Sequence, residues 1–354
     1  MSGVQTLEIG PDEGDQRLDR WFRRIFPHVP QGRIEKMCRK GEIRVDGGRV
    51  KSNTRLEVGQ MVRIPPLPDA EQMEKVRGAQ SVQPRRISEA DEKMIRAAVI
   101  YRDDHIIALN KPAGLPTQGG TGQARHVDGL AEALTFGFDE KPRLVHRLDK
   151  DTSGVLLLAR TRMGAKALTD AFRLRSTRKI YWAAVAGSPL PRMGTIKLGL
   201  VKAPGHGRGG ENEKMRAVPV DEIPHVEGAK RAETDYAVLS NLGGRVCWCA
   251  LVPITGRTHQ LRAHMAEIGH PIIGDGKYGG SGQENLGDGW GAQLGGDISR
   301  KLHLHARSLS FRHPMTGAQI NLVAPLPSHM EKTWATLGWD PRDVLADPFE
   351  DEPF

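Results

Sequence analysis

Residues 146–154 read His-Arg-Leu-Asp-Lys-Asp-Thr-Ser-Gly, and the apolar run Val155–Ala159 follows them directly. A short continuous apolar run of this kind is typical of a buried strand. Asp149 and Arg147 lie two positions apart just before it, so both can approach one substrate, the first as a reacting carboxylate and the second as a probe. The stretch therefore predicts a functional carboxylate. A structural aspartate that makes a turn hydrogen bond is the alternative.

The composition favours a protein that binds a polyanion. The chain has 354 residues, of which 38% are hydrophobic, and its formal net charge is +8. This length predicts two domains, or one large domain with a small one appended, and the apolar fraction is sufficient for a sizeable core. Nucleic acid is the commonest partner of a chain with such an excess of positive charge. A basic face that is merely solvated is the alternative.

The three cysteines, Cys38, Cys247 and Cys249, are too few for a disulfide framework and fit a reducing cytosol. Cys247 and Cys249 flank Trp248 in an alternating segment, which places both on the same side of a strand. A zinc site would need further ligands nearby, and the sequence has no second cysteine pair. We therefore expect both to be buried as small hydrophobic residues.

The N-terminus lacks the basic start and apolar core of a secretory signal, and no run of about eighteen apolar residues occurs. We expect a soluble, cytoplasmic protein with no membrane partner.

Residues 16–65 predict a small domain. Leu18, Phe22 and Phe26 recur at helical spacing, and Pro27 ends that helix. Gln31–Lys40 predicts a second helix stopped by Gly41, and Asp46-Gly47-Gly48 predicts the turn of a hairpin. Both helices are rich in basic residues. The small domain's candidate RNA contacts are Arg17, Arg20, Lys40 and Arg44.

The rest of the chain predicts a linker, a large domain and a tail. Residues 66–94 are polar and open with a proline-rich stretch, residues 95–338 alternate short β-like runs with helices, and residues 339–354 form an acidic tail expected to be poorly ordered. Strands and helices do not alternate strictly, which favours an α+β domain over a doubly wound sheet. Residues 202–230 and 281–299 are rich in glycine and charge and predict long surface loops. The β-like runs are Ile106–Leu109, Val155–Ala159, Ile180–Val185, Tyr236–Leu239 and Val246–Val252.

The string at residues 146–154 resembles the signature of the RluA-type pseudouridine synthases, which isomerise uridine in RNA. Three further segments, Leu109–Gly120, Arg178–Ala183 and Gly256–Asp275, resemble the other motifs of that family and occur in its order. The resemblance implies a mixed, mostly antiparallel sheet with flanking helices and a cleft at its middle. Residues 16–65 resemble the S-four-type (alpha-L) RNA-binding module. The end of the first segment is most similar to the C-type branch of the ribosomal large subunit enzymes.

The resemblance also implies roles for individual residues. Asp149 is the nucleophile, and Arg262 pairs with it, which would keep the carboxylate charged and aimed. Tyr181 lays its ring against a uracil flipped out of the RNA, and Arg147 enters the stack where that base leaves. For Tyr181 a buried strand tyrosine is the alternative, and for Arg147 a plain phosphate contact. Two further RNA contacts are expected near the site, His146 and Lys111.

The implied reaction needs no redox change, energy source or metal. The uracil leaves C1′ of its ribose, rotates and rejoins through C5, and a carboxylate suffices as nucleophile at either C6 or C1′. The sequence leaves both routes open. His259 and His264 are five positions apart and lack the His-Glu-x-x-His spacing, so we reject a metal site. No cofactor is expected.

The sequence thus predicts an RNA pseudouridine synthase that acts on large-subunit (23S) ribosomal RNA or a pre-ribosomal particle as a monomer. The alternative is an RNA-binding or ribosome-assembly factor that keeps the fold without catalysis. The presence of Asp149, Tyr181 and Arg262 together argues against that alternative.

Overall fold

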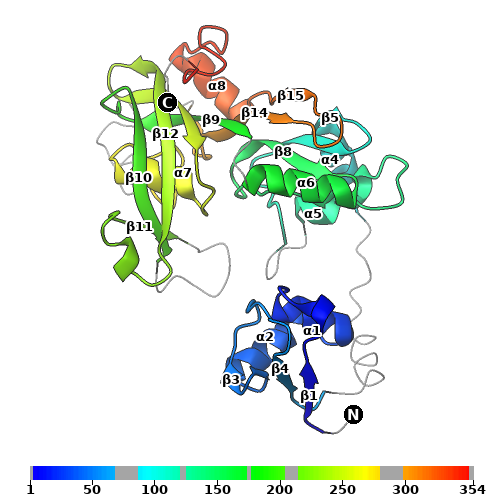
Figure 1. Ribbon diagram of the computed structural model, residues 1–354. Helices are drawn as coiled ribbons and strands as arrows, with labels where there is room; N and C mark the ends of the chain where they lie inside the picture. Colours follow the sequence, from blue (N-terminus) through cyan, green and yellow to red (C-terminus); the bar gives the residue numbers. More distant parts are fainter. Residues whose placement is uncertain are drawn as a thin grey trace. The chain divides into compact units, whose positions relative to one another are not determined.

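The computed structural model describes residues 3–67, 87–119, 125–173, 177–203, 214–279 and 298–350. The chain divides into two compact units, Met1–Arg86 and Ile87–Phe354 (Figure 1).

The first unit packs two helices against a four-stranded sheet of order β1-β4-β2-β3. The helices α1 (Leu18–Ile25) and α2 (Gln31–Lys40) form where the sequence predicts them. Gly41 ends α2 in the left-handed conformation, with φ 72°, which glycine adopts without steric cost. Leu18 and Phe22 are fully buried in the core. The strands are β1 (Gln5–Glu8), β2 (Arg44–Val45), β3 (Gly48–Arg49) and β4 (Met61–Ile64), and η1 (Pro11–Glu13) is a short 3-10 turn.

The second unit is built on an eleven-stranded sheet whose main path is β11-β10-β12-β13-β9-β14-β8-β6-β5, with β15 paired to β14 and β7 to β8. Among the described strands only β14 and β8 pair in parallel, so the sheet is mixed and mostly antiparallel, as predicted. The strands are β5 (Val99–Arg102), β6 (Ile106–Lys111), β7 (Arg143–Leu144), β8 (Ser153–Ala159), β9 (Arg178–Ala186), β10 (Met193–Lys202), β11 (Met215–Val218), β12 (Lys230–Leu242), β13 (Val246–Pro253), β14 (Leu304–Arg312) and β15 (Gln319–Val323). The helices are α4 (Glu89–Ala97), α5 (Val127–Leu130), α6 (Arg162–Arg173), α7 (Gln260–Glu267) and α8 (Ser328–Leu337), and η2 (Ala131–Leu134) and η4 (Ile223–His225) are 3-10 turns.

Helices α7 and α8 pack against opposite faces of the central strands β9 and β13. On one face, Trp248 of β13 contacts Trp334 of α8, with ring centroids 5.5 Å apart. On the other, Cys247 and Cys249 lie fully buried in a cluster that includes Met265 of α7. The prediction that both cysteines are buried on one side of a strand is confirmed. Because side chains alternate along a strand, Tyr181 of β9 faces the α7 side and packs against that second cluster.

Two predicted boundaries differ from the structure. Helix α4 begins at Glu89, inside the segment 66–94 that we expected to be a linker, and residues 68–86 lie outside the described residues. The predicted loop 202–230 contains strand β11, which pairs with β10. Residues 204–213 of that loop and nearly all of the second predicted loop, residues 280–297, are also outside the described residues.

The expectation of a poorly ordered acidic tail is wrong for residues 339–350. Trp339 and Phe349 are buried in the core cluster under α8. Arg178 of β9 donates to both carboxylate oxygens of Asp347, at 2.7 and 2.8 Å. The acidic composition of this segment alone favours disorder. The two buried aromatic side chains and the bidentate ion pair offset the entropy lost when the segment becomes ordered.

Three histidines of the second unit are fully buried, and burial lowers the pKa of His264 and His303 to about 4 and that of His305 to about 3. A buried imidazole resists protonation, so the unfolded chain binds more protons once the pH falls below the ordinary value of 6.5.

We therefore expect the free energy of unfolding to fall by roughly 1 kcal/mol per histidine for each pH unit between about 6.5 and 4. Urea unfolding of the chain at a series of pH values measures this loss. A stability that stays constant down to about pH 4.5 would contradict it.

Candidate active site

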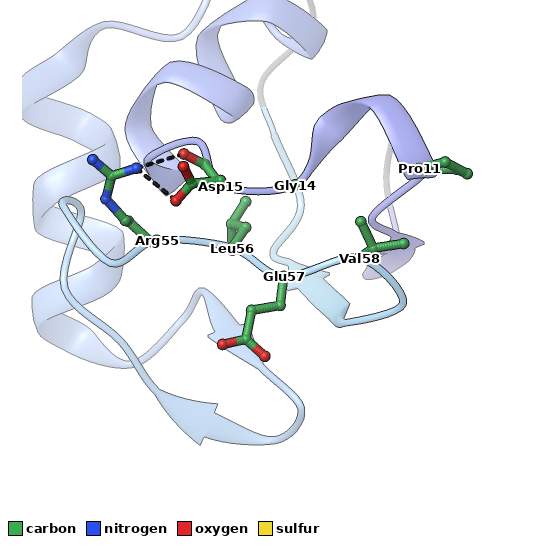
Figure 2. A pocket seen from close by; sticks show the side chains of 7 residues that line it. All are labelled: Pro11, Gly14, Asp15, Arg55, Leu56, Glu57 and Val58. Carbon is green, nitrogen blue, oxygen red and sulfur yellow. Dashed lines mark hydrogen bonds and ion pairs between the residues drawn. The ribbon is translucent and has the colours of Figure 1, made fainter.

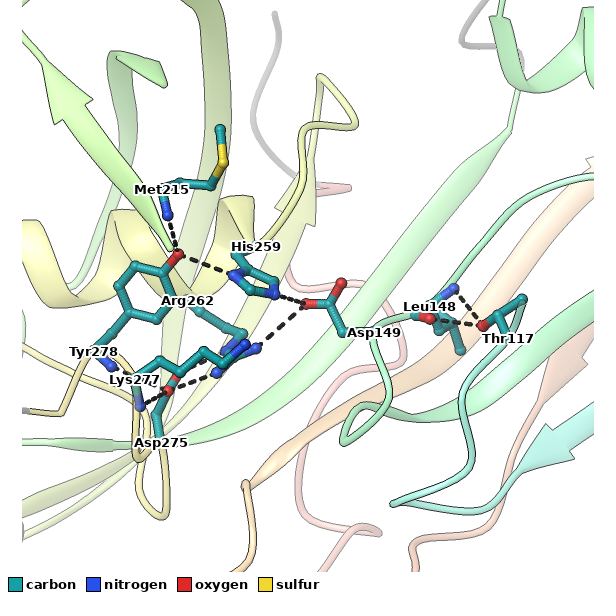
Figure 3. A network of polar contacts seen from close by, with 9 residues as sticks. All are labelled: Thr117, Leu148, Asp149, Met215, His259, Arg262, Asp275, Lys277 and Tyr278. Atoms are coloured by element: carbon teal, nitrogen blue, oxygen red, sulfur yellow. Dashed lines mark hydrogen bonds and ion pairs between the residues drawn. The ribbon is translucent and has the colours of Figure 1, made fainter. Parts of the chain in front are cut away.

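Asp149 lies in the loop between β7 and β8, with 29% of its side chain exposed. The backbone on either side of it is held by the loop that follows β6. The Thr117 hydroxyl donates to the Leu148 carbonyl at 2.6 Å and accepts from the Leu148 N–H at 3.2 Å (Figure 3). The Gly114 N–H donates to the Lys150 carbonyl at 2.9 Å. The carboxylate is therefore presented from a fixed backbone although its side chain reaches solvent.

Lys111 is a second part of this support. Its side chain is 0% exposed, and Nζ donates to the carbonyls of Pro112, Leu115 and Lys150 at 3.0, 2.8 and 3.0 Å. Burial lowers the pKa of Lys111 to about 7, although the charges of Asp151 and Asp149 raise it. These contacts do not favour the predicted RNA contact of Lys111, because all three ammonium protons are used inside the protein.

Replacing Lys111 with methionine leaves three carbonyls without their donor. We expect a loss of about 1–3 kcal/mol in the free energy of unfolding, and no change in how RNA affinity depends on salt. Urea unfolding and a salt titration of RNA binding measure the two effects. A salt dependence weakened by about one phosphate contact in the methionine variant would restore Lys111 as an RNA ligand.

Arg262 is held mainly by a carboxylate that the sequence reasoning did not single out. Its Nε and Nη2 donate to the two oxygens of Asp275 at 2.7 Å each, and both side chains are almost fully buried. Its Nη1 lies 3.6 Å from Oδ2 of Asp149. Burial lowers the pKa of Arg262, but the hydrogen bonds and charge of Asp275, with the charge of Asp149, outweigh it and leave that pKa above its usual value. The predicted contact with Asp149 is thus present, and Asp275 orients it.

His259 and Tyr278 complete this network, and the sequence reasoning missed both in this position. His259 precedes α7, and its Nε2 lies 3.9 Å from Oδ2 of Asp149. Its Nδ1 lies 3.0 Å from the Tyr278 hydroxyl. The centroid of the Tyr278 ring lies 5.3 Å from Cζ of the Arg262 guanidinium. Only their positions in the sequence could have indicated these two residues. His259 lies in the same segment as Arg262, and Tyr278 follows Asp275 by three residues.

Tyr181 lies on β9, half-buried, on the face that α7 covers. Burial raises the pKa of its hydroxyl, and the nearby charge of Asp149 raises it further, so the hydroxyl stays protonated at neutral pH. The structure thus brings Tyr181, Arg262 and Asp149 into one electrostatic environment.

The two residues of the signature that were expected to contact RNA differ in their surroundings. Arg147 is exposed. His146, in contrast, is engaged inside the protein. Its Nε2 accepts a hydrogen bond from the Leu157 N–H of β8 at 2.9 Å, and its ring stacks on Phe172 with centroids 4.5 Å apart. Burial lowers the pKa of His146 to about 3, so the ring is neutral. These contacts give His146 a structural role and leave Arg147 available to a ligand.

The basic residues of the first unit also differ in how far they are engaged. The Arg17 guanidinium donates to Asp19, Lys40 lies 3.7 Å from Glu42, and Arg44 donates to two backbone carbonyls. Arg20 is exposed. All four lie at the surface, where a polyanion can reach them.

A shallow hollow in this unit has a mixed charge. Arg55 donates through Nη1 to the carbonyl and the carboxylate of Asp15, at 2.7 and 2.6 Å, and Glu57 lines the same hollow with its carboxylate pointing away from that pair (Figure 2). Two carboxylates against one arginine do not favour a phosphate ligand. The lining residues are Pro11, Gly14, Asp15, Arg55, Leu56, Glu57 and Val58.

Within the described ranges, no three His, Cys, Asp or Glu side chains are grouped so that they could hold a metal ion. His264 points into the core and is fully buried, so it does not join His259. In that same part of the chain, no helix is both long and apolar enough to cross a membrane.

Known proteins resemble the chain over both units. The family described as RNA pseudouridylate synthase matches residues 105–267, and the S4 domain matches residues 16–62. Ribosomal large subunit pseudouridine synthase C of Salmonella typhimurium is 36% identical over 341 residues, covering 94% of this chain and 97% of that protein. The protein of the same name from Escherichia coli is 35% identical, covering 93% and 95%. A solved structure, Human RNA Pseudouridylate Synthase Domain Containing 4, is 30% identical with a TM-score of 0.56, covering 70% of this chain and 95% of that one.

The relatives match nearly their whole length to this chain, and the structural neighbour shares its fold over 70% of this chain. The S4 match includes the two basic helices and strands β2 and β3 of the small sheet. The chain therefore belongs to the RluA-type RNA pseudouridine synthases, with an S4 domain as its N-terminal unit.

Proposed function

We propose that this enzyme converts specific uridines of large-subunit (23S) ribosomal RNA to pseudouridine, with Asp149 as the nucleophile. The names of its relatives support the substrate, since they are ribosomal large subunit pseudouridine synthases at 33–36% identity over more than nine-tenths of the chain. The observation that carries the role of Asp149 is its position: a partly exposed carboxylate on a fixed backbone, 3.6 Å from the Arg262 guanidinium.

The two oxygens of Asp149 have different surroundings. Within the described part of the chain, the polar contacts from Arg262 and His259 both reach Oδ2 and neither reaches Oδ1. Oδ2 is therefore the anchored oxygen and Oδ1 the one that attacks, at C6 of the base or C1′ of the ribose. The glycosidic bond to N1 breaks, the uracil turns, and a bond forms between C5 and C1′. The bond between Oδ1 and the nucleotide then breaks, the C5 proton leaves and N1 takes up a proton. No electron or energy carrier enters this balance.

The substrate uridine must leave its stack to reach Asp149, because the base is inaccessible inside a helix. Arg147 is the exposed cation two residues from Asp149, and its planar guanidinium can stack in the vacated position or bind a neighbouring phosphate. Tyr181 supplies the ring against which the extruded uracil stacks.

The exposed basic residues of the S4 unit contribute affinity through phosphate contacts. We expect Arg20→Gln to weaken RNA binding and to lower the slope of log affinity against log salt by about 1. Arg55→Gln is the matched control in the same unit, because Arg55 is already paired with Asp15. The two slopes are measured by binding titrations at several salt concentrations. Equal slopes for the two variants would remove Arg20 from the RNA interface.

The proposed substrate is tested by mapping pseudouridines in the ribosomal RNA of a strain that lacks the protein. Specific positions in the large-subunit RNA should revert to uridine and be restored by the intact gene. An unchanged large-subunit pattern, with sites lost from another RNA, would overturn the proposed substrate but not the family.

A further inference from the structure

His259 lies between Asp149 and Tyr278, and its surroundings determine which of its ring nitrogens carries hydrogen (Figure 3). Its side chain is 9% exposed, with Nδ1 3.0 Å from the Tyr278 hydroxyl and Nε2 3.9 Å from Oδ2 of Asp149. Its backbone is left-handed, with φ 52°, a conformation in which histidine and asparagine are enriched. This backbone turns the ring away from α7 and towards the Asp149 loop.

The protonation of the ring follows from its neighbours. Burial lowers the pKa of His259, although the charge of Asp149 opposes this, so the imidazole is neutral at and above neutral pH. Burial raises the pKa of Tyr278 to about 12, so its hydroxyl keeps its proton. A neutral ring carries one N–H, and that hydrogen is on either Nδ1 or Nε2.

The hydrogen-bond directions select Nε2. The Met215 N–H of β11 donates to the Tyr278 oxygen at 2.8 Å, which leaves the hydroxyl hydrogen for His259 Nδ1. Nδ1 then accepts, and the ring hydrogen is on Nε2, facing Asp149. The opposite tautomer would direct the Nε2 lone pair at a carboxylate that can only accept, which is repulsive.

We propose that His259 is a positioning residue for Asp149, held by Tyr278 in the tautomer that offers Nε2–H to Oδ2. Together with Nη1 of Arg262, at 3.6 Å from the same oxygen, it fixes the rotation of the carboxylate so that Oδ1 faces the substrate. The separation of 3.9 Å needs to shorten by under about 1 Å to make a hydrogen bond, and such contacts tighten when substrate binds. This inference rests on the proposed role of Asp149 as nucleophile.

The arrangement links Asp149 to the far edge of the sheet. Tyr278 contacts both groups that hold Oδ2, through its hydroxyl to His259 and its ring to Arg262. It is itself oriented by Met215 on β11, which pairs with β10 alone among the described strands. The hydroxyl of Tyr278 is therefore the group on which the tautomer depends.

Three variants test the proposal. His259→Gln places an amide N–H near the position of Nε2, and His259→Asn tolerates the left-handed backbone but is too short to reach Asp149. Tyr278→Phe keeps the ring against Arg262 and removes the hydroxyl. Tyr236→Phe is the matched control, since its hydroxyl bonds to the Pro191 carbonyl at 3.0 Å, away from Asp149. Each protein is assayed by single-turnover tritium release from 23S RNA labelled at uridine C5, by RNA binding and by thermal unfolding.

We expect His259→Asn to slow the single-turnover rate at least tenfold with RNA affinity unchanged within about twofold. His259→Gln should recover most of that rate, Tyr278→Phe should fall between the two, and Tyr236→Phe should match the wild type. An asparagine variant at wild-type rate, or a glutamine variant as slow as asparagine, would overturn the proposal. So would a rate loss that only follows a loss of folded protein or RNA affinity. These outcomes differ from a failure of the proposed function. In that case the wild type itself would release no tritium, or Asp149→Asn would stay active.

Discussion

Asp149→Asn is expected to abolish tritium release from RNA labelled at uridine C5 while RNA binding stays intact. The amide keeps the size of the carboxylate but has no anionic oxygen to attack the nucleotide, and removing a nucleophile costs on the order of 10⁴-fold or more in turnover. The backbone contacts from Thr117 and Gly114 do not involve the side chain, so the fold should be unaffected.

The neighbouring carboxylate provides the control. Asp151 is exposed and lies in the same loop, so Asp151→Asn removes one negative charge from the same surface. Its rate should stay within a few-fold of the wild type. Release by Asp149→Asn at a similar rate to Asp151→Asn would remove Asp149 as the nucleophile.

Arg262→Met is expected to have the second large effect, on both stability and turnover. It leaves Asp275 as an uncompensated buried charge, at a cost of about 3–5 kcal/mol in the free energy of unfolding. It also removes the cationic contact at 3.6 Å to Oδ2 of Asp149, so turnover should fall far more than RNA affinity. Urea unfolding and single-turnover kinetics measure the two effects separately.

A second substitution separates the two effects of Arg262. Adding Asp275→Asn removes the buried charge, while the amide oxygen can still accept from the N–H groups of Lys277 and Tyr278. The double variant should regain much of the stability lost by Arg262→Met and none of the turnover. If turnover recovers together with stability, Arg262 supports the fold and does not act on Asp149. If affinity falls more than turnover, Arg262 is an RNA-binding residue.

Much of the local structure was predictable because it depends on neighbours in the sequence. The stop at Gly41 predicted the end of α2, whose observed bounds, Gln31–Lys40, are those expected. The alternation around Trp248 predicted β13 and the shared face of its cysteines. The sequence also predicted Asp149, Tyr181 and Arg262 as site residues through their resemblance to one family. In the structure Arg262 lies 3.6 Å from Asp149, and the charge of Asp149 acts on the Tyr181 hydroxyl.

The sequence alone therefore determined the family and many of the helices and strands, and it predicted the three central side chains, because each of these depends on short stretches of neighbouring residues. Only the tertiary structure decided which polar groups meet. Lys111 was expected to contact RNA, yet its ammonium is enclosed by carbonyls that include one 39 residues away. The tautomer of His259 depends on Met215 and Tyr278, 63 residues apart. Whether a charged side chain is solvated or buried depends on which distant segments pack around it, and no local pattern carries that information.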